Sequence, residues 1–145
     1  MMAFFTNIMK REIKFRGLRK QKWIIGLIDN VFFKQAIIRY FDEELKLPVT
    51  ANVHEETIGQ FTGLKDKNGT DIYEGDIVTY KRSIGNWAGE FMTTTHEIVF
   101  NEEVFAFVMK YGSSYIKLRK HWGYEYEVIG NIFLNKELLN ENIKT

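Results

Sequence analysis

Hydrophobic and polar positions alternate along much of the chain, which is the period-2 pattern of half-buried strands. In residues 11–16, REIKFR, the apolar side chains fall on one face, while Lys14 and Arg16 share the solvent face. Residues 22–28, KWIIGLI, are apolar on both faces and predict an interior strand. The first part of the chain is therefore expected to form a β-sheet.

The next two segments have less regular patterns. Asp29 and Asn30 predict a turn, and residues 31–41, VFFKQAIIRYF, fit either a helix or a strand. The β-branched and aromatic content of residues 31–41 favours a strand, although the pattern leaves the choice open. Residues 42–57 contain Pro48 and predict a loop with one helical turn. We expect this loop to mark the boundary between two halves of the chain.

A segment rich in glycine and acidic residues, residues 55–78, lies at the centre of the chain and contains ETIGQFTGLKDKNGTDIYEGDIV. Asn68 and Gly69 are its strongest turn signal, because both residue types accept positive φ. Gly75 separates two apolar pairs and predicts a tight bend that leads into a new strand. The structural turn and hinge residues are therefore Asn68, Gly69 and Gly75, and we expect the acidic side chains around them to be solvated.

The rest of the chain predicts five short strands and one helix. The strands are residues 77–82, 91–100, 104–111, 114–120 and 126–133. Five strands at this spacing, with a longer loop after the first, predict a small SH3-like barrel. Residues 135–143 predict a short C-terminal helix with Asn135 as its N-cap. The predicted fold class is therefore mostly β, in an α+β arrangement.

These elements divide the chain into three parts and an extension. We expect an N-terminal β-rich subdomain, a connecting strand–turn segment and an SH3-like five-stranded barrel with the C-terminal helix, over residues 9–54, 55–76 and 77–143. Residues 1–8 precede them as an extension without an assigned structural role. The apolar side chains of the N-terminal half exceed what one small fold hides, so we expect this half to be a self-association region of a homo-oligomer.

Composition excludes several classes of protein. The 145 residues include no cysteine, which removes disulfides, cysteine-ligated zinc and thiol catalysis together. Twenty basic residues against 19 acidic ones give a net charge of +1, too small for a general attraction to nucleic acid or anionic lipid. No apolar stretch has the roughly 20 residues that span a bilayer. We expect a soluble cytoplasmic protein with no membrane partner.

One basic segment stands out against this balance. Residues 10–22 carry a group of basic side chains that are candidates for binding nucleic acid or a protein partner: Lys14, Arg16, Arg19, Lys20 and Lys22. Basic side chains beside aromatic ones such as Phe15 and Trp23 are typical of single-stranded nucleic acid binding. The alternative, which we favour, is a solvated strand face that protects a sheet edge from aggregation.

The central segment has the composition of a calcium loop but not its spacing. An EF-hand requires glycine at its sixth position and glutamate at its twelfth; counted from Asp66, these positions hold Asp71 and Ile77. The three histidines lack the HExxH spacing, and the chain has no Walker A or dinucleotide motif. We therefore expect no metal, no cofactor and no catalytic residue, and we predict that the protein is not an enzyme.

Three blocks of sequence resemble the YopX family of small phage and prophage proteins. They are KREIKFRG at residues 10–17, followed by Trp23 and Gly26, the long segment 55–78, and EVIGNIFLNKELL at residues 127–139. The resemblance covers the chain from Met9, near the family's usual start, to Leu139. It implies an N-terminal α+β part joined to an SH3-like barrel, often in an oligomer, with no established activity.

The resemblance and the pattern lead to one hypothesis and one alternative. We expect a non-catalytic accessory protein in the cytoplasm of a bacterial host, acting through self-assembly and through binding of an unidentified host or phage protein. The alternative is a small-barrel module that binds nucleic acid with residues 10–22. The sequence identifies neither the partner nor the stoichiometry of the oligomer.

Overall fold

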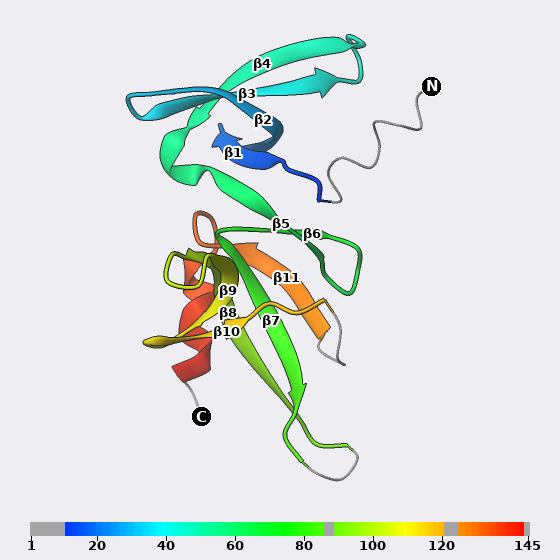
Figure 1. Cartoon of the computed structure of the whole chain (residues 1–145), viewed down its shortest axis with the longest axis vertical. Helices are drawn as coiled ribbons and strands as arrows, with labels where there is room; N and C mark the ends of the chain where they lie inside the picture. The colour runs from blue at the N-terminus through cyan, green and yellow to red at the C-terminus, as the bar shows by residue number, and fades with distance from the viewer. Residues whose placement is uncertain (1–10, 86–88, 121–124, 144–145) are drawn as a thin grey trace. The chain divides into compact units, whose positions relative to one another are not determined.

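The computed structural model describes residues 11–85, 89–120 and 125–143 of the chain. This part is almost entirely antiparallel β-structure and includes two short 3₁₀ helices, η2 and η3 (Figure 1). The chain divides into two compact units, Met1–Gly63 and Leu64–Thr145, which we name unit 1 and unit 2. The mostly β class predicted from the alternating pattern is therefore confirmed.

Unit 1 is built on five strands of a six-stranded sheet, whose order is β4-β3-β2-β1-β5-β6. Its elements are β1 (Phe15–Arg19), β2 (Lys22–Phe32), β3 (Gln35–Asp42), β4 (Leu47–His54), η2 (Glu55–Thr57) and β5 (Gly59–Lys65), whose last residues belong to unit 2. The first four strands form successive antiparallel hairpins, and β5 returns to pair with β1. Most pairings in this sheet therefore join strands that are neighbours in sequence.

The sheet of unit 1 curls so strongly that β1 approaches β4. A Cβ atom at Gly17 would lie 2.6 Å from Cγ2 of Val53 on β4. A Cβ atom at Gly26 would lie 2.1 Å from the carbonyl oxygen of Arg39 on the neighbouring strand. Both positions therefore require glycine, because a larger side chain collides with a packed neighbour.

The core of unit 1 lies on the inner face of the curled sheet. It consists mainly of small and β-branched residues, namely Ile24, Ala36, Ile38, Ala51 and Val53. The buried Thr57 ties η2 to β1, because its hydroxyl accepts a hydrogen bond from the Leu18 N–H at 2.8 Å. The same hydroxyl donates to the carbonyl oxygen of His54 at 2.7 Å.

The predicted turn at Asp29 and Asn30 is wrong. The strand β2 continues through these residues with a bulge between Ile28 and Asn30, where its register against β3 shifts. The chain reverses at Phe33 and Lys34 instead, and Lys34 adopts a positive φ of 61°. Residues 31–41, which the pattern left open, are the end of one strand and most of the next.

The predicted loop over residues 42–57 is also wrong in its middle. Residues Leu47–His54 form β4, and only the single helical turn survives, as η2. Pro48 is compatible with β4 because this strand is the last in the sheet order, and a proline costs least in an edge strand. The strand predicted at residue 11 begins at Phe15, and the extension of residues 1–8 lies outside the described part of the chain.

Unit 2 contains a five-stranded antiparallel sheet with the order β10-β9-β8-β7-β11. After β6 (Asp71–Tyr73), the neighbour of β5, come β7 (Asp76–Ser83), β8 (Phe91–Asn101), β9 (Ala106–Tyr111), β10 (Ser114–Lys117), β11 (Glu125–Asn131) and η3 (Lys136–Ile143). The five strands β7 to β11 correspond to the five that the pattern predicts. Large side chains fill the core: Ile72, Val78, Tyr80, Ile98, Met109 and Tyr126.

A closed SH3-like barrel is not confirmed in unit 2. The two end strands, β10 and β11, lie at opposite ends of the strand order, and within the described residues no ladder joins them. The sheet nevertheless curls until its ends approach, since the backbone N–H of Arg119, just after β10, donates to the hydroxyl of Tyr126 on β11 at 2.9 Å. Unit 2 is therefore a strongly curled open sheet.

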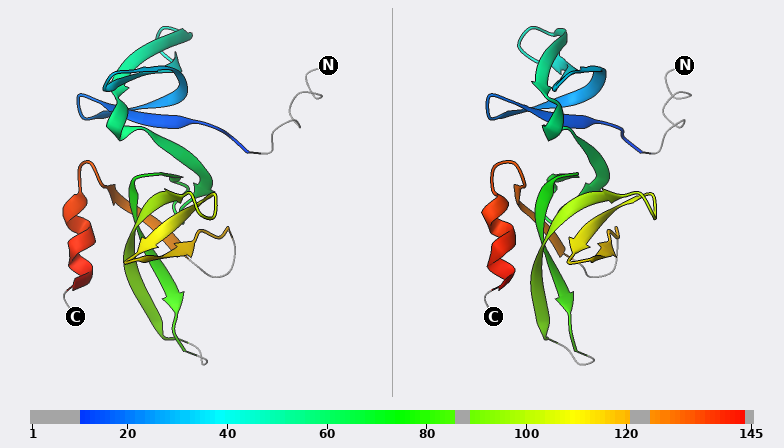
Figure 2. Two further views of the ribbon diagram at one scale, coloured as in Figure 1. Left: turned by 60° about the vertical axis from the view of Figure 1, so that its left-hand side comes forward. Right: turned by 90° about the vertical axis from the view of Figure 1, so that its left-hand side faces the viewer.

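The end of β11 is a turn held by asparagine side chains. The Oδ1 atom of Asn131 accepts hydrogen bonds from the N–H groups of Phe133 and Leu134 at 3.1 and 3.0 Å. A Cβ atom on Gly130 would lie 2.8 Å from Asn135, so this position also requires glycine. The helix η3 then runs beside β8 on one side of the sheet, and it has 3₁₀ rather than α geometry (Figure 2).

Candidate interaction surfaces

The turn at Asn68 and Gly69 is held by one buried carboxylate. The Oδ1 atom of Asp66 accepts hydrogen bonds from the N–H groups of Asn68 and Thr70 at 2.8 and 2.9 Å. Its Oδ2 atom accepts one from the N–H of Val128 on β11 at 3.0 Å. A single side chain therefore shapes the hairpin and fastens it to the other end of unit 2.

The environment of Asp66 explains its ionisation. Burial raises the pKa of this carboxyl, but the backbone hydrogen bonds from Val128, Thr70 and Asn68 outweigh that effect and lower the pKa below its ordinary value of 3.8. Asp76 is buried as well, at 1% exposure, and accepts a hydrogen bond from the N–H of Tyr73 at 2.7 Å. The expectation that the acidic side chains of this segment are solvated is therefore wrong for Asp66 and Asp76.

Gly75 lies at the bend that leads into β7. Its φ of +85° belongs to the left-handed region, which glycine adopts without strain. Its N–H donates to the carbonyl oxygen of Ile98 at 2.8 Å, and its own carbonyl oxygen accepts from the N–H of Ile132 at 2.9 Å. Gly75 thus connects the start of β7 to β8 and to the turn after β11, which is a structural role.

His96 is a core residue of unit 2. Its Nδ1 atom donates to the carbonyl oxygen of Lys110 at 2.9 Å, so the neutral ring accepts at Nε2 from the hydroxyl of Thr94 at 2.7 Å. Burial lowers the pKa of His96; the Lys110 carbonyl opposes this shift, and the positive charge of Arg82 adds to it. Both ring nitrogens are occupied by the fold, which leaves neither for a substrate or metal.

Of the other two histidines, the structure describes only His54. His54 is exposed at the end of β4, and His121 lies outside the described residues. Within the residues that the structure describes, no group of three His, Cys, Asp or Glu side chains converges on a position suited to a metal ion. The same residues contain no helix long and apolar enough to cross a membrane.

The structure separates the five basic residues predicted as a binding patch. Arg16 is buried to 7% exposure, and its guanidinium lies over the ring of Trp23, 4.1 Å from the ring centroid. The Nζ atom of Lys14 lies 4.5 Å from the ring centroid of Phe61 and forms an ion pair with Glu12 at 3.2 Å. The expected solvent-facing position is therefore wrong for Arg16, and Lys14 is engaged in packing.

The remaining three basic residues lie at the β1–β2 turn. Arg19, Lys20 and Lys22 are exposed there, and the turn is made by positive φ angles of 47° at Lys20 and 64° at Gln21. A hollow of about 170 Å³ beside this turn includes Arg19, Lys20 and the exposed His54 among its lining residues. This hollow is smaller than the roughly 300 Å³ at which ligand pockets begin.

Unit 1 has a second candidate surface, on the outer side of β2 and β3. The sequence pattern predicts self-association through this half of the chain but does not identify the residues. On β3, Ala36 and Ile38 are fully buried, so the alternate positions face away from the core. On this outer face of β2 and β3, four large apolar side chains are 44–56% exposed: Ile25, Leu27, Phe32 and Phe41. We name these four residues the apolar face.

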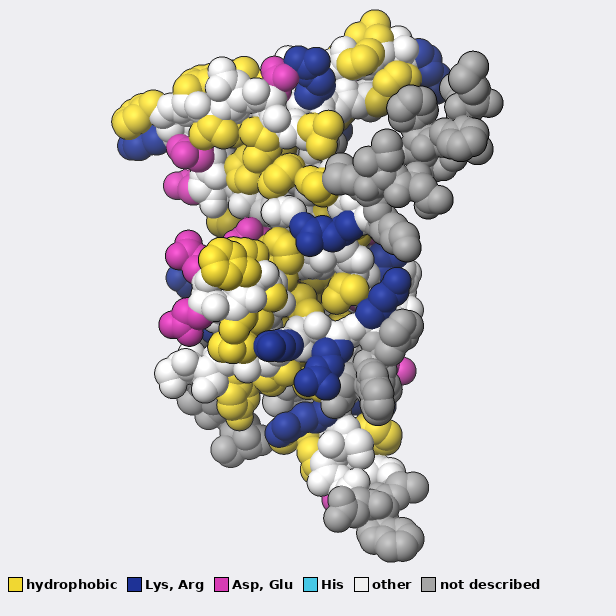
Figure 3. Space-filling model, viewed as in Figure 1, with side chains coloured by type: hydrophobic (Ala, Val, Ile, Leu, Met, Phe, Trp, Pro, Cys, Tyr) yellow, Lys and Arg dark blue, Asp and Glu magenta, His cyan; other side chains and the backbone are white. Residues whose placement is uncertain are grey.

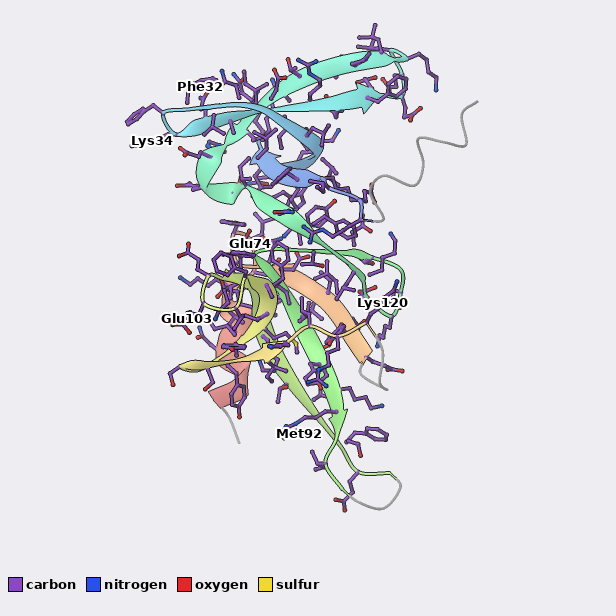
Figure 4. The ribbon with its side chains drawn as sticks, viewed as in Figure 1. Phe32, Lys34, Glu74, Met92, Glu103 and Lys120 are labelled. Atoms are coloured by element: carbon purple, nitrogen blue, oxygen red, sulfur yellow. The ribbon has the colours of Figure 1, made fainter. Side chains whose placement is uncertain are left out.

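The hairpin tips of unit 1 extend its exposed apolar surface. Phe33, at the β2–β3 turn, is 86% exposed, and Leu45, at the β3–β4 turn, is 62% exposed. Phe32 and Lys34 mark the first of these tips in Figure 4, and hydrophobic side chains gather over unit 1 in Figure 3. The charged pair on this side, Arg39 and Asp29, is internally neutralised at 2.6 Å.

Comparison with known proteins identifies a family and a structural similarity. Residues 14–140 match the family model described as YopX protein. Among solved structures, the chain is similar to the crystal structure of protein EF1440 from Enterococcus faecalis, with 24% sequence identity and a TM-score of 0.46. That similarity covers 89% of this chain and 99% of the other. No curated protein matches the chain.

Proposed function

Because the chain belongs to the YopX family, we propose that it is a phage or prophage accessory protein, without catalytic activity, that works by self-assembly and protein–protein binding. The observation that supports this proposal is the apolar face of unit 1. An antiparallel sheet that covers a core on one side normally presents polar side chains on the other. Here four large apolar side chains occupy the solvent side instead.

A second copy of the chain is the occupant that this surface fits best. In a two-fold symmetric dimer, each residue of the apolar face is buried once from each copy. The buried area is therefore twice that of one apolar face. Full burial of one such side chain stabilises by about 1.5–3 kcal/mol, and each of the four is already about half buried. Eight half-buried side chains therefore contribute about 8 kcal/mol.

This estimate predicts a weak, concentration-dependent dimer. The loss of translational and rotational freedom on association costs about 4–15 kcal/mol, a range that includes the gain from the apolar face. The neutralised Arg39–Asp29 pair adds no net charge that would keep two copies apart. Self-association and binding of another protein through the same face are then competing events, which suits an accessory protein that exchanges partners.

Light scattering on the intact chain tests this proposal. We expect the mass to rise above the 17.2 kDa of one chain as protein concentration increases. Leu27→Glu places a charge in the centre of the apolar face and should abolish the rise. The control is Thr93→Glu, which adds the same charge at an exposed position of β8 in unit 2, a strand that does not belong to the apolar face. A wild-type protein that stays monomeric at every concentration, or a Leu27→Glu variant that still assembles, would contradict the proposal.

We also propose an architecture for unit 2. We regard its curled five-stranded sheet as an open relative of the SH3-like barrel, on the support of the strand count, the strand order and the Arg119–Tyr126 hydrogen bond between its ends. We also place the protein in the cytoplasm of a bacterial host. Small barrels of this kind serve many functions, so the architecture by itself adds no activity.

A further inference from the structure

Unit 2 has a groove that is separate from the surfaces described above. Its volume is about 510 Å³, which lies within the range of about 300–1,000 Å³ that is typical of ligand sites. One wall comes from the end of β7, and the other comes from β10 and the residues just after it. The strands β7 and β10 are three positions apart in the strand order, and the curl of the sheet brings them together.

The charges that line the groove have one sign. Arg82 contributes from β7, Lys117 from β10 and Arg119 from the segment that follows, and the groove has no acidic residue in its lining. The two contributing segments, residues 80–83 and 115–119, contain four basic residues and no acidic ones. Unit 2 as a whole has 12 acidic and ten basic residues, a net charge of −2. The cations are therefore concentrated at the groove.

These three cations are available to a ligand. Within the described part of the chain, Arg82, Lys117 and Arg119 form no ion pair. A bound anion therefore has no carboxylate of the described residues to displace. Figure 3 shows Lys and Arg side chains gathered over β7 and β10 in unit 2.

The walls of the groove are fixed by packing. Tyr80 belongs to the core at 4% exposure, and its ring lies 5.6 Å from that of Tyr126. Ile116 packs against the same core and anchors β10. The N–H of Arg119 donates to the Tyr126 hydroxyl, which holds the chain after β10 in place. The cations are thus carried by an ordered backbone, so that less ordering is required on binding.

An aromatic side chain completes the site. Tyr115 lines the groove two positions before Lys117, on the same side of β10, and remains 36% exposed. A positively charged groove with an exposed aromatic ring is the combination that binds single-stranded nucleic acid, through phosphates and stacked bases. A duplex is normally read by a convex element inserted into its groove, whereas this site is concave.

We propose that this groove binds single-stranded nucleic acid, with phosphates at Arg82, Lys117 and Arg119 and a base stacked on Tyr115. Each phosphate contact on a single strand contributes about −0.7 to the slope of log K against log salt. Three contacts therefore predict a slope of about −2. The site differs from residues 10–22, and binding to it does not require the apolar face of unit 1.

Fluorescence anisotropy with labelled oligo(dT) and oligo(U) tests the proposal on the intact chain across a salt series. We expect binding at low salt and a slope near −2. The triple variant Arg82→Ala, Lys117→Ala, Arg119→Ala should weaken binding at least tenfold at low salt and bring the slope close to zero. Tyr115→Ala should weaken binding about tenfold with an unchanged slope, because it removes stacking and no charge. Tyr115→Phe should bind like the wild type.

A matched control removes three charges from the other basic site. The variant Arg19→Ala, Lys20→Ala, Lys22→Ala lowers the net charge by the same amount and should retain the affinity and slope of the wild type. The proposal is overturned if this control loses binding while the groove variant keeps it, or if neither strand binds at low salt. It is also overturned if duplex DNA or polyglutamate displaces the labelled strand as well as an unlabelled strand does. Circular dichroism confirms that each variant is folded.

Discussion

Unit 1 and unit 2 are both curled antiparallel sheets, yet they are held together in different ways. The core of unit 1 includes Ala36 and Ala51, and glycines at residues 17 and 26 allow its strands to approach closely. The core of unit 2 contains large side chains, and buried polar groups such as Asp66 and His96 fasten its turns and strands. The fold of unit 1 depends mainly on small side chains that let strands pack closely. The fold of unit 2 depends mainly on hydrogen bonds made by buried polar side chains.

This difference also affects the surfaces that remain for binding. A sheet that curls around small residues has little volume in which to hide large ones, and the large apolar residues of unit 1 accordingly lie on its outer side. Unit 2 has a core of large residues, yet it also exposes apolar side chains, such as Phe105 at 82% exposure. What distinguishes its surface is the group of cations that lines the groove.

The largest expected effect comes from removing the carboxylate that organises unit 2. Asp66→Ala leaves three backbone N–H groups, those of Asn68, Thr70 and Val128, without their acceptor. Hydrogen bonds to a charged group contribute about 1.5–3 kcal/mol each, and they are partly replaced by water, so we expect a loss of about 3–5 kcal/mol. Urea unfolding monitored by circular dichroism measures this loss.

The control for Asp66 is another carboxylate that contacts the same region. Glu127 on β11 forms an ion pair with Lys67 at 2.8 Å, but both side chains are 41% exposed. Exposed ion pairs contribute little to stability, so Glu127→Ala should have a much smaller effect than Asp66→Ala. Equal losses for the two variants would show that buried hydrogen bonds are not what holds unit 2 together.

The second effect tests the close approach of strands in unit 1. Gly26→Ala places a Cβ atom 2.1 Å from the carbonyl oxygen of Arg39, so the strands must separate. Overpacking of this kind destabilises by about 1–3 kcal/mol, and we expect a loss near 3 kcal/mol because the colliding atom is in the backbone. Thermal unfolding reports the change.

Gly69→Ala is the matched comparison in unit 2. Gly69 has a φ of +80° and open space around it, so an added methyl group meets strain in the backbone but no neighbour. Left-handed backbone costs an alanine about 1–2 kcal/mol, which is less than the collision at Gly26. If Gly69→Ala proved the more harmful of the two, close packing would not be the main constraint on unit 1.

A smaller effect is expected where the two ends of the unit 2 sheet meet. Tyr126→Phe keeps the ring in the core and removes the hydroxyl that accepts the N–H of Arg119. The loss of one neutral hydrogen bond should cost about 1 kcal/mol. Hydrogen exchange at the Arg119 amide should also become faster, and an unchanged rate would mean that this bond does not bridge the two ends of the sheet.

The smallest effect appears only below neutral pH. The pKa of His96 is lowered in the folded protein, so the unfolded chain binds a proton first, at about 6.5. The stability that neutral His96 contributes is fully present above pH 6.5. It is lost as the pH falls through 6.5 towards the lower pKa of His96 in the folded protein. The denaturant concentration at the unfolding midpoint should therefore fall as the pH is lowered from about 8 to about 5.5. It should fall less in His96→Gln.

Two observations separate this effect from other titrations. His54→Gln alters an exposed histidine and should leave the decline unchanged. The pKa of Asp66 is also lowered, but from 3.8, so its contribution is present above that pH and disappears only in more acidic solution. A decline of the same size in the wild type and in His96→Gln would remove His96 as its cause.

The regions that sequence predicts well are those with local signals. The five strands of unit 2 alternate clearly, and Asn68-Gly69 forms the expected turn because its backbone preference is intrinsic. The pattern does not predict β4, although Ala51 and Val53 alternate with exposed residues, because Pro48 and polar neighbours obscure the alternation. Asp29 and Asn30 mimic a turn, but the neighbouring strand accommodates them in a bulge.

Sequence reasoning could not find features that depend on distant partners. In the sequence, nothing distinguishes Asp66 from a surface aspartate. Its role depends on β11, which places the N–H of Val128 within hydrogen-bond distance of its carboxylate. Arg16 follows the polar alternation of its strand, yet it lies over the ring of Trp23. In the unit 2 groove, Arg82 is 35 or more residues from Lys117 and Arg119 in sequence and meets them only because the sheet curls.

The hydrogen bond between Asp66 and Val128 has a consequence for the order in which the protein is completed during synthesis. It joins residues 62 positions apart, near the two ends of unit 2. The strands of unit 1 are synthesised before those of unit 2, and their pairings are mostly between successive strands. The Asp66 turn lacks its final contact until β11 has been made. We therefore expect newly made chains to fold unit 1 first and to complete unit 2 only with its last strand.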